Sequence, residues 1–108
     1  MLLNPQSKLT WEDPTTYTDG SAVSEAEIPG YNIHLGQKSG VYTIVHNVPN
    51  SEPDEAILGN IPGLKAGTWF AAISTAATGA VMESALTAEI TFDYTDKQFS
   101  KPTNFGSA

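Results

Sequence analysis

Hydrophobic and polar residues alternate along much of this chain with a period of two, the period of a β-strand. Leu9 and Trp11 share one face of a first predicted strand. Tyr31, Ile33 and Leu35 alternate with Asn32, His34 and Gly36 in a second, which we expect to be half-buried, with Tyr31, Ile33 and Leu35 inward and His34 outward. No helical periodicity of useful length is present. The pattern therefore predicts an all-β protein.

Further β-compatible segments follow, separated by residues that favour turns. They predict strands at 41–48, 55–61, 69–76 and 84–94. Short strands at short intervals, with turns between them, favour an antiparallel β-sandwich.

The segment that follows the Lys65-Ala66-Gly67 turn is expected to organise the core. Trp69, Ala71 and Ile73 share one face of it, and Leu64 lies on the other side of the turn. The predicted core takes the inward face of every strand. It comprises Leu9, Trp11, Tyr31, Ile33, Leu35, Leu64, Trp69, Ala71, Ile73, Leu86, Ile90 and Phe92.

Three parts of the chain differ in pattern. Residues 1–8 are predicted to form an N-terminal arm or a rudimentary first strand, residues 9–94 the sandwich, and residues 95–108 an extended C-terminal tail. Phe99 and Phe105 are the large apolar residues of this otherwise polar tail. Either they pack on their own domain or they dock on a neighbouring subunit. With Leu2 and Leu3, they form the predicted interface set.

Charge excludes some classes of partner. The formal net charge is −7, and all five basic residues are lysines. Nucleic acids and anionic membranes attract clustered cations, so neither is expected as a partner. There is no cysteine, no run of about 20 apolar residues and no signal peptide at the start. We expect a complete small protein; an excised domain with an added start methionine is the alternative.

Candidate chemistry is sparse. His34 and His46 are the only histidines, and no Gly-x-Ser-x-Gly motif for a nucleophilic serine occurs. Glu52, Asp54 and Glu55 cluster beside two prolines, but the Asp-x-Asp spacing of calcium loops is missing. The sequence therefore predicts no catalytic, cofactor-binding or metal-binding residues, no cofactor and no enzymatic activity.

The order of several short motifs resembles that of a fibronectin type III domain of the bacterial and phage variety. The motifs are Leu-Thr-Trp at 9–11, Asp-Gly-Ser at 19–21, Gly-Tyr-Asn-Ile-His-Leu-Gly at 30–36, Gly-Leu-Lys-Ala-Gly-Thr-Trp-Phe at 63–70, and Gly-x-x-x-Glu-Ser at 79–84. The resemblance covers residues 9–94 and implies a seven-stranded immunoglobulin-like sandwich.

Two departures from the family pattern have consequences. The family usually has a tyrosine at the corner before strand F, where its hydroxyl bonds to the preceding turn. Trp69 or Phe70 takes that place here. We favour Trp69, because it puts Ala71 and Ile73 inward and because its indole N–H can make this bond, whereas Phe70 has no donor. Too few residues precede Leu9 for a full strand A. An edge of the sandwich is therefore expected to be open to pairing.

The resemblance and the arm-like termini predict a non-enzymatic structural or adhesion protein of a tailed phage virion. It would serve as a capsid decoration or as a tail or neck component, located in the virion after assembly in the host cytoplasm. Its expected partners are other virion proteins and further copies of itself, with host surface carbohydrate as another candidate. The alternative is a carbohydrate-binding or spacer module of a larger bacterial secreted protein.

Overall fold

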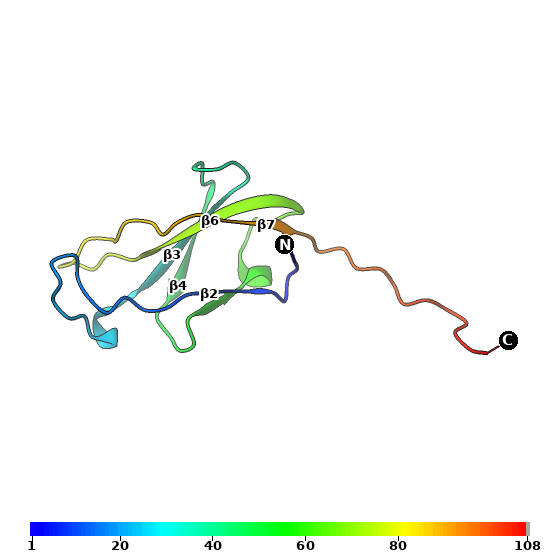
Figure 1. The fold of residues 1–108 in the computed structure, drawn as a ribbon, viewed down its shortest axis with the longest axis horizontal. Coiled ribbons are helices and arrows are strands. Elements are labelled where there is room, and N and C mark those ends of the chain that lie inside the picture. Colours follow the sequence, from blue (N-terminus) through cyan, green and yellow to red (C-terminus); the bar gives the residue numbers. More distant parts are fainter. Residues whose placement is uncertain (108) are drawn as a thin grey trace.

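The computed structural model describes residues 1–107 and arranges them as two open β-sheets that pack against each other (Figure 1). The larger sheet has the order β1 (Leu2–Leu3), β7 (Ile90–Tyr94), β6 (Gly67–Thr75), β3 (Gly30–Gly36) and β4 (Ile44–Pro49). The smaller sheet pairs β2 (Lys8–Thr10) with β5 (Glu55–Ile57). Two short 3₁₀ helices, η1 (Glu25–Glu27) and η2 (Leu58–Asn60), complete the fold. The all-β prediction is confirmed.

Strand β3 is an inner strand of the larger sheet, antiparallel to both of its neighbours. Ile33 pairs with His46 of β4 on one side and with Ile73 of β6 on the other. Strand β6 continues the antiparallel order to β7, where Trp69 pairs with Phe92. Directly opposed residues of paired strands share a face. Trp69 and Phe92 therefore meet on the inner face.

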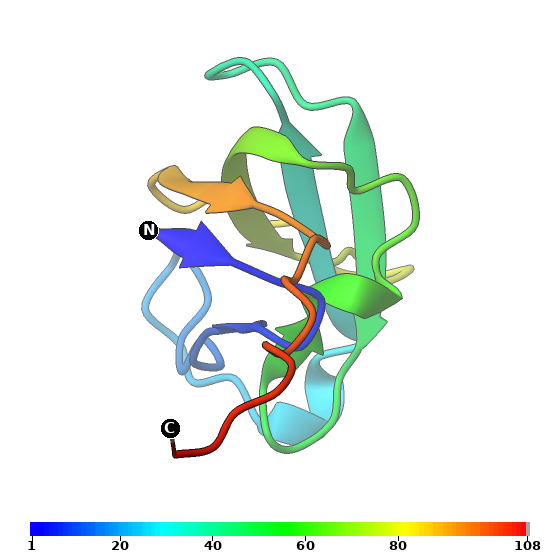
Figure 2. The ribbon, with the colours of Figure 1, turned by 90° about the vertical axis from the view of Figure 1, so that its right-hand side faces the viewer.

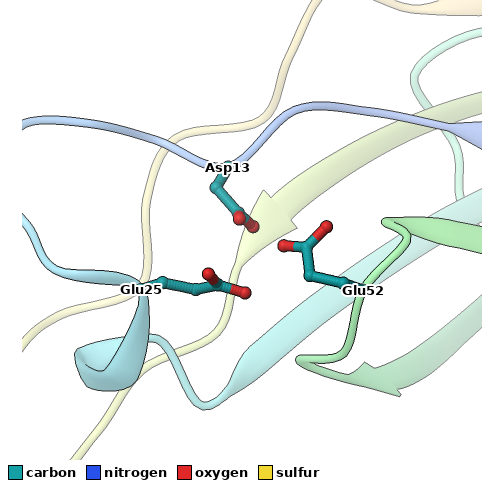
Figure 3. A group of neighbouring side chains, drawn as sticks. All are labelled: Asp13, Glu25 and Glu52. Carbon is teal, nitrogen blue, oxygen red and sulfur yellow. The ribbon is translucent and has the colours of Figure 1, made fainter.

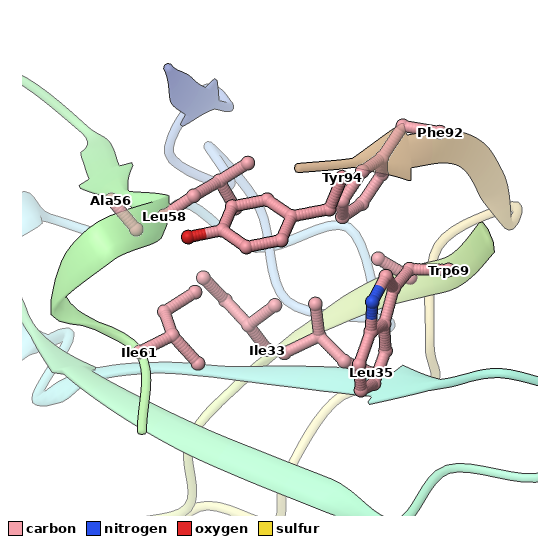
Figure 4. Packing of buried hydrophobic residues seen from close by; sticks show 9 residues of the cluster. Ile33, Leu35, Ala56, Leu58, Ile61, Trp69, Phe92 and Tyr94 are labelled. Atoms are coloured by element: carbon pink, nitrogen blue, oxygen red, sulfur yellow. The ribbon is translucent and has the colours of Figure 1, made fainter. Parts of the chain in front are cut away.

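The core fills the space between the sheets (Figure 4). Leu35, Trp69 and Phe92 of the large sheet are at most 2% exposed, and they pack in one cluster with Leu58 and Ile61 at η2. Half of the predicted core is fully buried: Tyr31, Ile33, Leu35, Trp69, Ala71 and Phe92. Four more predicted core residues are half-buried and pack against the cluster: Leu9, Trp11, Leu64 and Ile73.

The predicted hydrogen bond of Trp69 is confirmed. Its indole Nε1 donates to the carbonyl oxygen of Lys65 at 2.8 Å. The bond ties the start of β6 to the turn that precedes it. It also supplies the one polar atom of this buried ring with a partner, which burial otherwise makes costly.

The predicted strand at 84–94 is wrong in its first half, since β7 begins only at Ile90. The hydroxyl oxygens of Ser84 and Thr87 accept the backbone N–H groups of Thr75 and Ile73. Side chains thus take the place of the backbone carbonyls that a regular ladder uses. The chain stays beside β6 but loses the alternation of a strand.

Two predicted core residues fall in or next to this irregular segment, and both predictions are wrong. Leu86 is 42% exposed and Ile90 is 45% exposed. Without regular pairing, the face of Leu86 is no longer fixed toward the core. Ile90 begins β7 opposite Ala71, at a place where the smaller sheet does not cover it.

Two other strands are shorter than predicted. Strand β5 ends at Ile57 because the chain turns into η2, which buries Leu58 completely. Strand β4 begins at Ile44 rather than residue 41, because Val41 closes a turn by donating to Lys38 at 3.0 Å. In both places a local turn ends the β pattern.

The N-terminal residues form a short strand on the larger sheet. Strand β1 pairs in parallel with β7, and Asp93 N–H donates to the Met1 carbonyl at 2.8 Å. Leu3 is half-buried and packs against the core, whereas Leu2 is 67% exposed. Leu3 is therefore engaged within its own domain, contrary to its prediction as an interface residue.

The C-terminal tail continues from β7 away from the sandwich (Figure 1). Figure 2 views the sandwich from the side on which the tail leaves, so the tail points toward the viewer there. The tail makes the described molecule 70 Å long against widths of 29 and 20 Å. No helix within residues 1–107 has the length and apolar character required to cross a membrane.

Candidate functional site

The tail exposes both of its phenylalanines completely. Phe99 and Phe105 have relative exposures of 101% and 100%. Thr95 N–H donates to the Leu3 carbonyl at 3.1 Å, at the point where the tail leaves the sandwich. Of the two alternatives raised by the sequence, packing of these rings on their own domain does not occur in this structure. Both rings are free to contact another surface.

The tail and the sandwich carry opposite net charges. Asp96, Lys97 and Lys101 give the tail a formal charge of +1. The first 94 residues hold the other three lysines and eleven acidic residues, a formal charge of −8. The charge of the tail therefore complements that of the sandwich.

An apolar groove lies between the two sheets, beside β2. Its volume is about 280 Å³. One wall comes from β2 and the residue after it, another from β3 and β6, and a third from the irregular segment before β7. The lining residues are Leu9, Thr10, Trp11, Ile33, Ala71, Ala72, Ile73, Thr87, Ala88 and Ile90.

The backbone edge of β2 beside this groove is unpaired. Ser7 carbonyl accepts from Leu58 N–H at 2.9 Å, and Trp11 N–H donates to Asp54 carbonyl at 3.4 Å. Backbone groups of alternate residues point to opposite sides of a strand. Those of Lys8 and Thr10 therefore point away from β5. Within residues 1–107 no strand pairs with this side of β2, so the open edge expected from the sequence is present.

An acidic cluster lies at one end of the sandwich (Figure 3). Asp13, Glu25 and Glu52 each place a carboxylate oxygen within 4.8 Å of the others. Tyr31 donates its hydroxyl to Asp13, which joins the cluster to β3. Such oxygens suit a hard cation such as Ca²⁺, but carboxylates this close also share protons. The three residues lie far apart in the sequence, so no local motif brings them together.

The pKa values of Asp13 and Glu52, and that of the neighbouring Asp54, shift in different directions. The Tyr31 hydroxyl lowers the pKa of Asp13. Hydrogen bonds with Glu25 and Asp13, together with partial desolvation and neighbouring negative charge, raise the pKa of Glu52 to about 7. Desolvation raises the pKa of Asp54, and the hydrogen bond with Asp13 raises it further. Glu52 therefore binds its proton at a higher pH than an ordinary glutamate does.

Replacing Glu52 by glutamine is expected to raise the melting temperature at pH 8. A carboxyl whose pKa is raised on folding binds its proton more tightly in the folded state. Its contribution to stability is therefore largest at low pH and declines as the pH rises from about 4.5 toward 7. The glutamine cannot acquire the repelling charge.

Thermal unfolding with a chelator present, at pH 5 and pH 8, tests this expectation. The gain from Glu52→Gln should be present at pH 8 and nearly absent at pH 5. Glu12→Gln, which removes a nearby acid outside the cluster, is the control. An equal gain for both variants, or the same gain at both pH values, would contradict the shared proton.

A serine, a histidine and a glutamate meet on the outer face of the larger sheet. The Ser74 hydroxyl lies 3.4 Å from His34 Nε2 and donates to Glu83. Glu83 Oε2 lies 3.7 Å from the same Nε2. In a catalytic triad the acid and the serine bond to different ring nitrogens. Both contact one nitrogen here, so the group attaches the 83–84 segment to the sheet instead of activating Ser74.

The two histidines lie on opposite faces of the larger sheet. His46 is opposite Ile33, which points into the core, whereas His34 follows Ile33 and points outward. The outward prediction for His34 is confirmed. The two rings cannot ligate one metal ion together.

Comparisons with protein-family models, with curated proteins and with solved structures found no match. The fold therefore defines the class of the protein as an all-β chain of two open sheets. Its distinguishing features are the extended tail and the open edge of β2.

Proposed function

We propose that this chain is a non-enzymatic structural protein that assembles through its C-terminal tail. The observation that carries the proposal is the complete exposure of Phe99 and Phe105 on a segment that leads away from the sandwich beyond Thr95. Burying a phenylalanine side chain contributes about 1.5–3 kcal/mol. Two rings presented on an extended segment therefore supply much of the energy for an interface.

We further propose a fibronectin type III-like sandwich in a tailed phage virion, as capsid decoration or as a tail or neck component. The motif order at residues 9–94 supports the family. The strand order supports it as well, with β2 and β5 facing the antiparallel set β4, β3, β6 and β7. The phage assignment rests on the resemblance alone. The partners would be other virion proteins and further copies of this chain.

The non-enzymatic part is supported by the geometry of the polar groups. In the Ser74, His34 and Glu83 group, the serine and the acid contact the same histidine nitrogen, unlike in the catalytic triad of a hydrolase. The apolar groove beside β2 has only Thr10 and Thr87 as polar lining residues. Neither place combines a nucleophile with a correctly oriented base.

Light scattering of the full-length protein over a range of concentrations tests the proposal. The native chain is expected to form oligomers, and Phe99→Ser with Phe105→Ser is expected to leave a folded monomer. Met82→Ser removes an apolar side chain that is 90% exposed outside the tail, and should leave assembly unchanged. A native chain that stays monomeric at every concentration, or a double variant that still assembles, would contradict the proposal.

The alternative of a carbohydrate-binding or spacer module is favoured less. Sugar binding uses exposed aromatic rings as stacking surfaces. Trp69 is 2% exposed, and Trp11 is half-buried, edge-on to Tyr31 with ring centroids 5.3 Å apart. The two tryptophans therefore do not form an exposed, flat stacking surface. A spacer role requires no such face and is the form of the alternative that we retain.

A further inference from the structure

We propose that the open edge of β2 receives residues 96–101 of a second copy as an added strand, with Phe99 seated in the adjoining groove. This inference rests on the proposed function and names the surface that the tail binds. It turns the smaller sheet of each accepting molecule into three strands. The tail and the groove are on the same chain, so a single sequence supplies both halves of the contact.

The backbone of β2 supplies the first half of the argument. The N–H and C=O groups of Lys8 and Thr10 point away from β5, and no strand of the described chain covers them. An extended peptide satisfies such groups by adding one more strand. Residues 96–101 are already extended in this structure, so little reorganisation is needed. Pro102 ends the added strand because it has no N–H to donate.

The groove supplies the second half. Leu9 of β2 and Trp11, the residue after this strand, line the groove together with Ile73 and Ile90. A strand added beside β2 would place alternate side chains in the same space. A cavity of about 150 Å³ already holds a benzene ring, so the 280 Å³ of this groove accommodates the ring of Phe99. A Phe99 ring in the groove would also cover Ile90, which is 45% exposed in the single chain.

Charge favours this pairing over other contacts between copies. Two sandwiches of charge −8 repel each other, whereas Lys97 and Lys101 flank Phe99 on a tail of charge +1. Glu12 and Asp13 follow Trp11 at the end of the groove and provide negative charge there. Assembly should therefore weaken as the salt concentration rises.

The tail of the same chain is less well placed for the groove. Ile90 lies at the groove and begins β7, whereas the tail leaves from the other end of that strand, beyond Tyr94. It continues away from the sandwich (Figure 1). To fill its own groove, the chain would have to reverse directly after β7. A second copy needs no such reversal.

Cysteine pairing between copies tests the position, since the native chain has no cysteine. A full-length Thr10→Cys variant is mixed with a full-length Ser100→Cys variant and oxidised. Side chains alternate along a strand, so those of Thr10 and Ser100 turn away from those of Leu9, Trp11 and Phe99. The Thr10 and Ser100 side chains should therefore lie together on the outer face of the extended sheet. A mixed disulfide between the two chains is expected, identified by mass spectrometry. Lys38→Cys mixed with Ser100→Cys is the control pair and should give only background.

A second variant tests the groove through assembly. Ala88 is exposed and lines the groove, so Ala88→Arg should leave the fold intact while it places bulk and positive charge where Phe99 is expected. Association should fall by about tenfold or more, as for other changes at an interface centre. Ala26→Arg, at an exposed position of η1, is the matched control and should assemble normally.

The outcomes separate this inference from the proposed function. A mixed disulfide at Thr10 and loss of assembly in Ala88→Arg support the inference. If the serine variant of Phe99 and Phe105 dissociates, but Ala88→Arg assembles and the mixed disulfide stays at background, the groove is wrong and the proposed function stands. A double Thr10→Cys, Ser100→Cys chain that closes on itself as a monomer overturns the exchange between copies.

Discussion

Replacing Trp69 by alanine is expected to destabilise the fold by about 3–5 kcal/mol, the usual cost of removing a large aromatic ring from a core. The ring is 2% exposed and packs in the central cluster that joins the two sheets. Its Nε1 also donates to the Lys65 carbonyl at 2.8 Å, so the variant leaves that carbonyl without this donor. Domains of this size have only about 5–15 kcal/mol of stability in total. Urea unfolding followed by circular dichroism measures the loss.

Two further variants provide comparisons for the loss of stability in Trp69→Ala. Trp69→Phe keeps a ring in the core but removes the donor to Lys65, so it should cost less than the alanine. Trp11→Ala should also cost less, because Trp11 is half-buried and its indole N–H has no acceptor to lose. Equal losses for Trp69→Ala and Trp11→Ala would show that the core is not centred on the start of β6.

Replacing Gly36 by alanine is expected to destabilise the protein by about 1–3 kcal/mol, the range for overpacking a fitted site. A Cβ at residue 36 would lie 1.8 Å from the Val41 carbonyl oxygen and 2.9 Å from the carbonyl carbon. Both are backbone atoms, so no side-chain rotation relieves the contact. Gly36 ends β3 and pairs with Phe70 of β6, so movement away from Val41 disturbs that pairing.

Thermal unfolding gives the measurement for Gly36→Ala. Each kcal/mol lowers the melting temperature by roughly 4–8 °C in a domain of about this size. Gly79→Ala is the matched control, because a Cβ there has no atom within 4 Å. It should change stability by less than about 0.5 kcal/mol. Similar melting temperatures for the two variants would contradict the close approach of residues 36 and 41.

The central strands could be predicted because hydrophobic residues recur at every second position along them. Tyr31, Ile33 and Leu35 are all buried, as are Trp69 and Ala71. The hydrogen bond from Trp69 to the preceding turn was also predictable, since its ring is buried and carries a single donor. Burial on one face of a sheet leaves no other register for such residues.

The irregular segment before β7 could not be read from the same pattern. Leu86 and Ile90 continue the period-two spacing of Phe92 but are exposed. The placement of Leu86 depends on hydroxyl groups of Ser84 and Thr87 that replace carbonyls in the ladder with β6, and that of Ile90 depends on the limited reach of the smaller sheet. The pattern of hydrophobic residues does not show where side-chain hydroxyls replace backbone carbonyls as hydrogen-bond acceptors.

By itself, the sequence determined the all-β class, the central strands and most of the core, because alternation and burial act locally along each strand. It also marked Phe99 and Phe105 as apolar residues in a polar tail. Only the tertiary structure decided which surfaces meet. It gathered Asp13, Glu25 and Glu52, and it left the edge of β2 open beside an apolar groove. These features arise where segments distant in sequence pack together, and contacts of that kind leave no periodic signal in the chain.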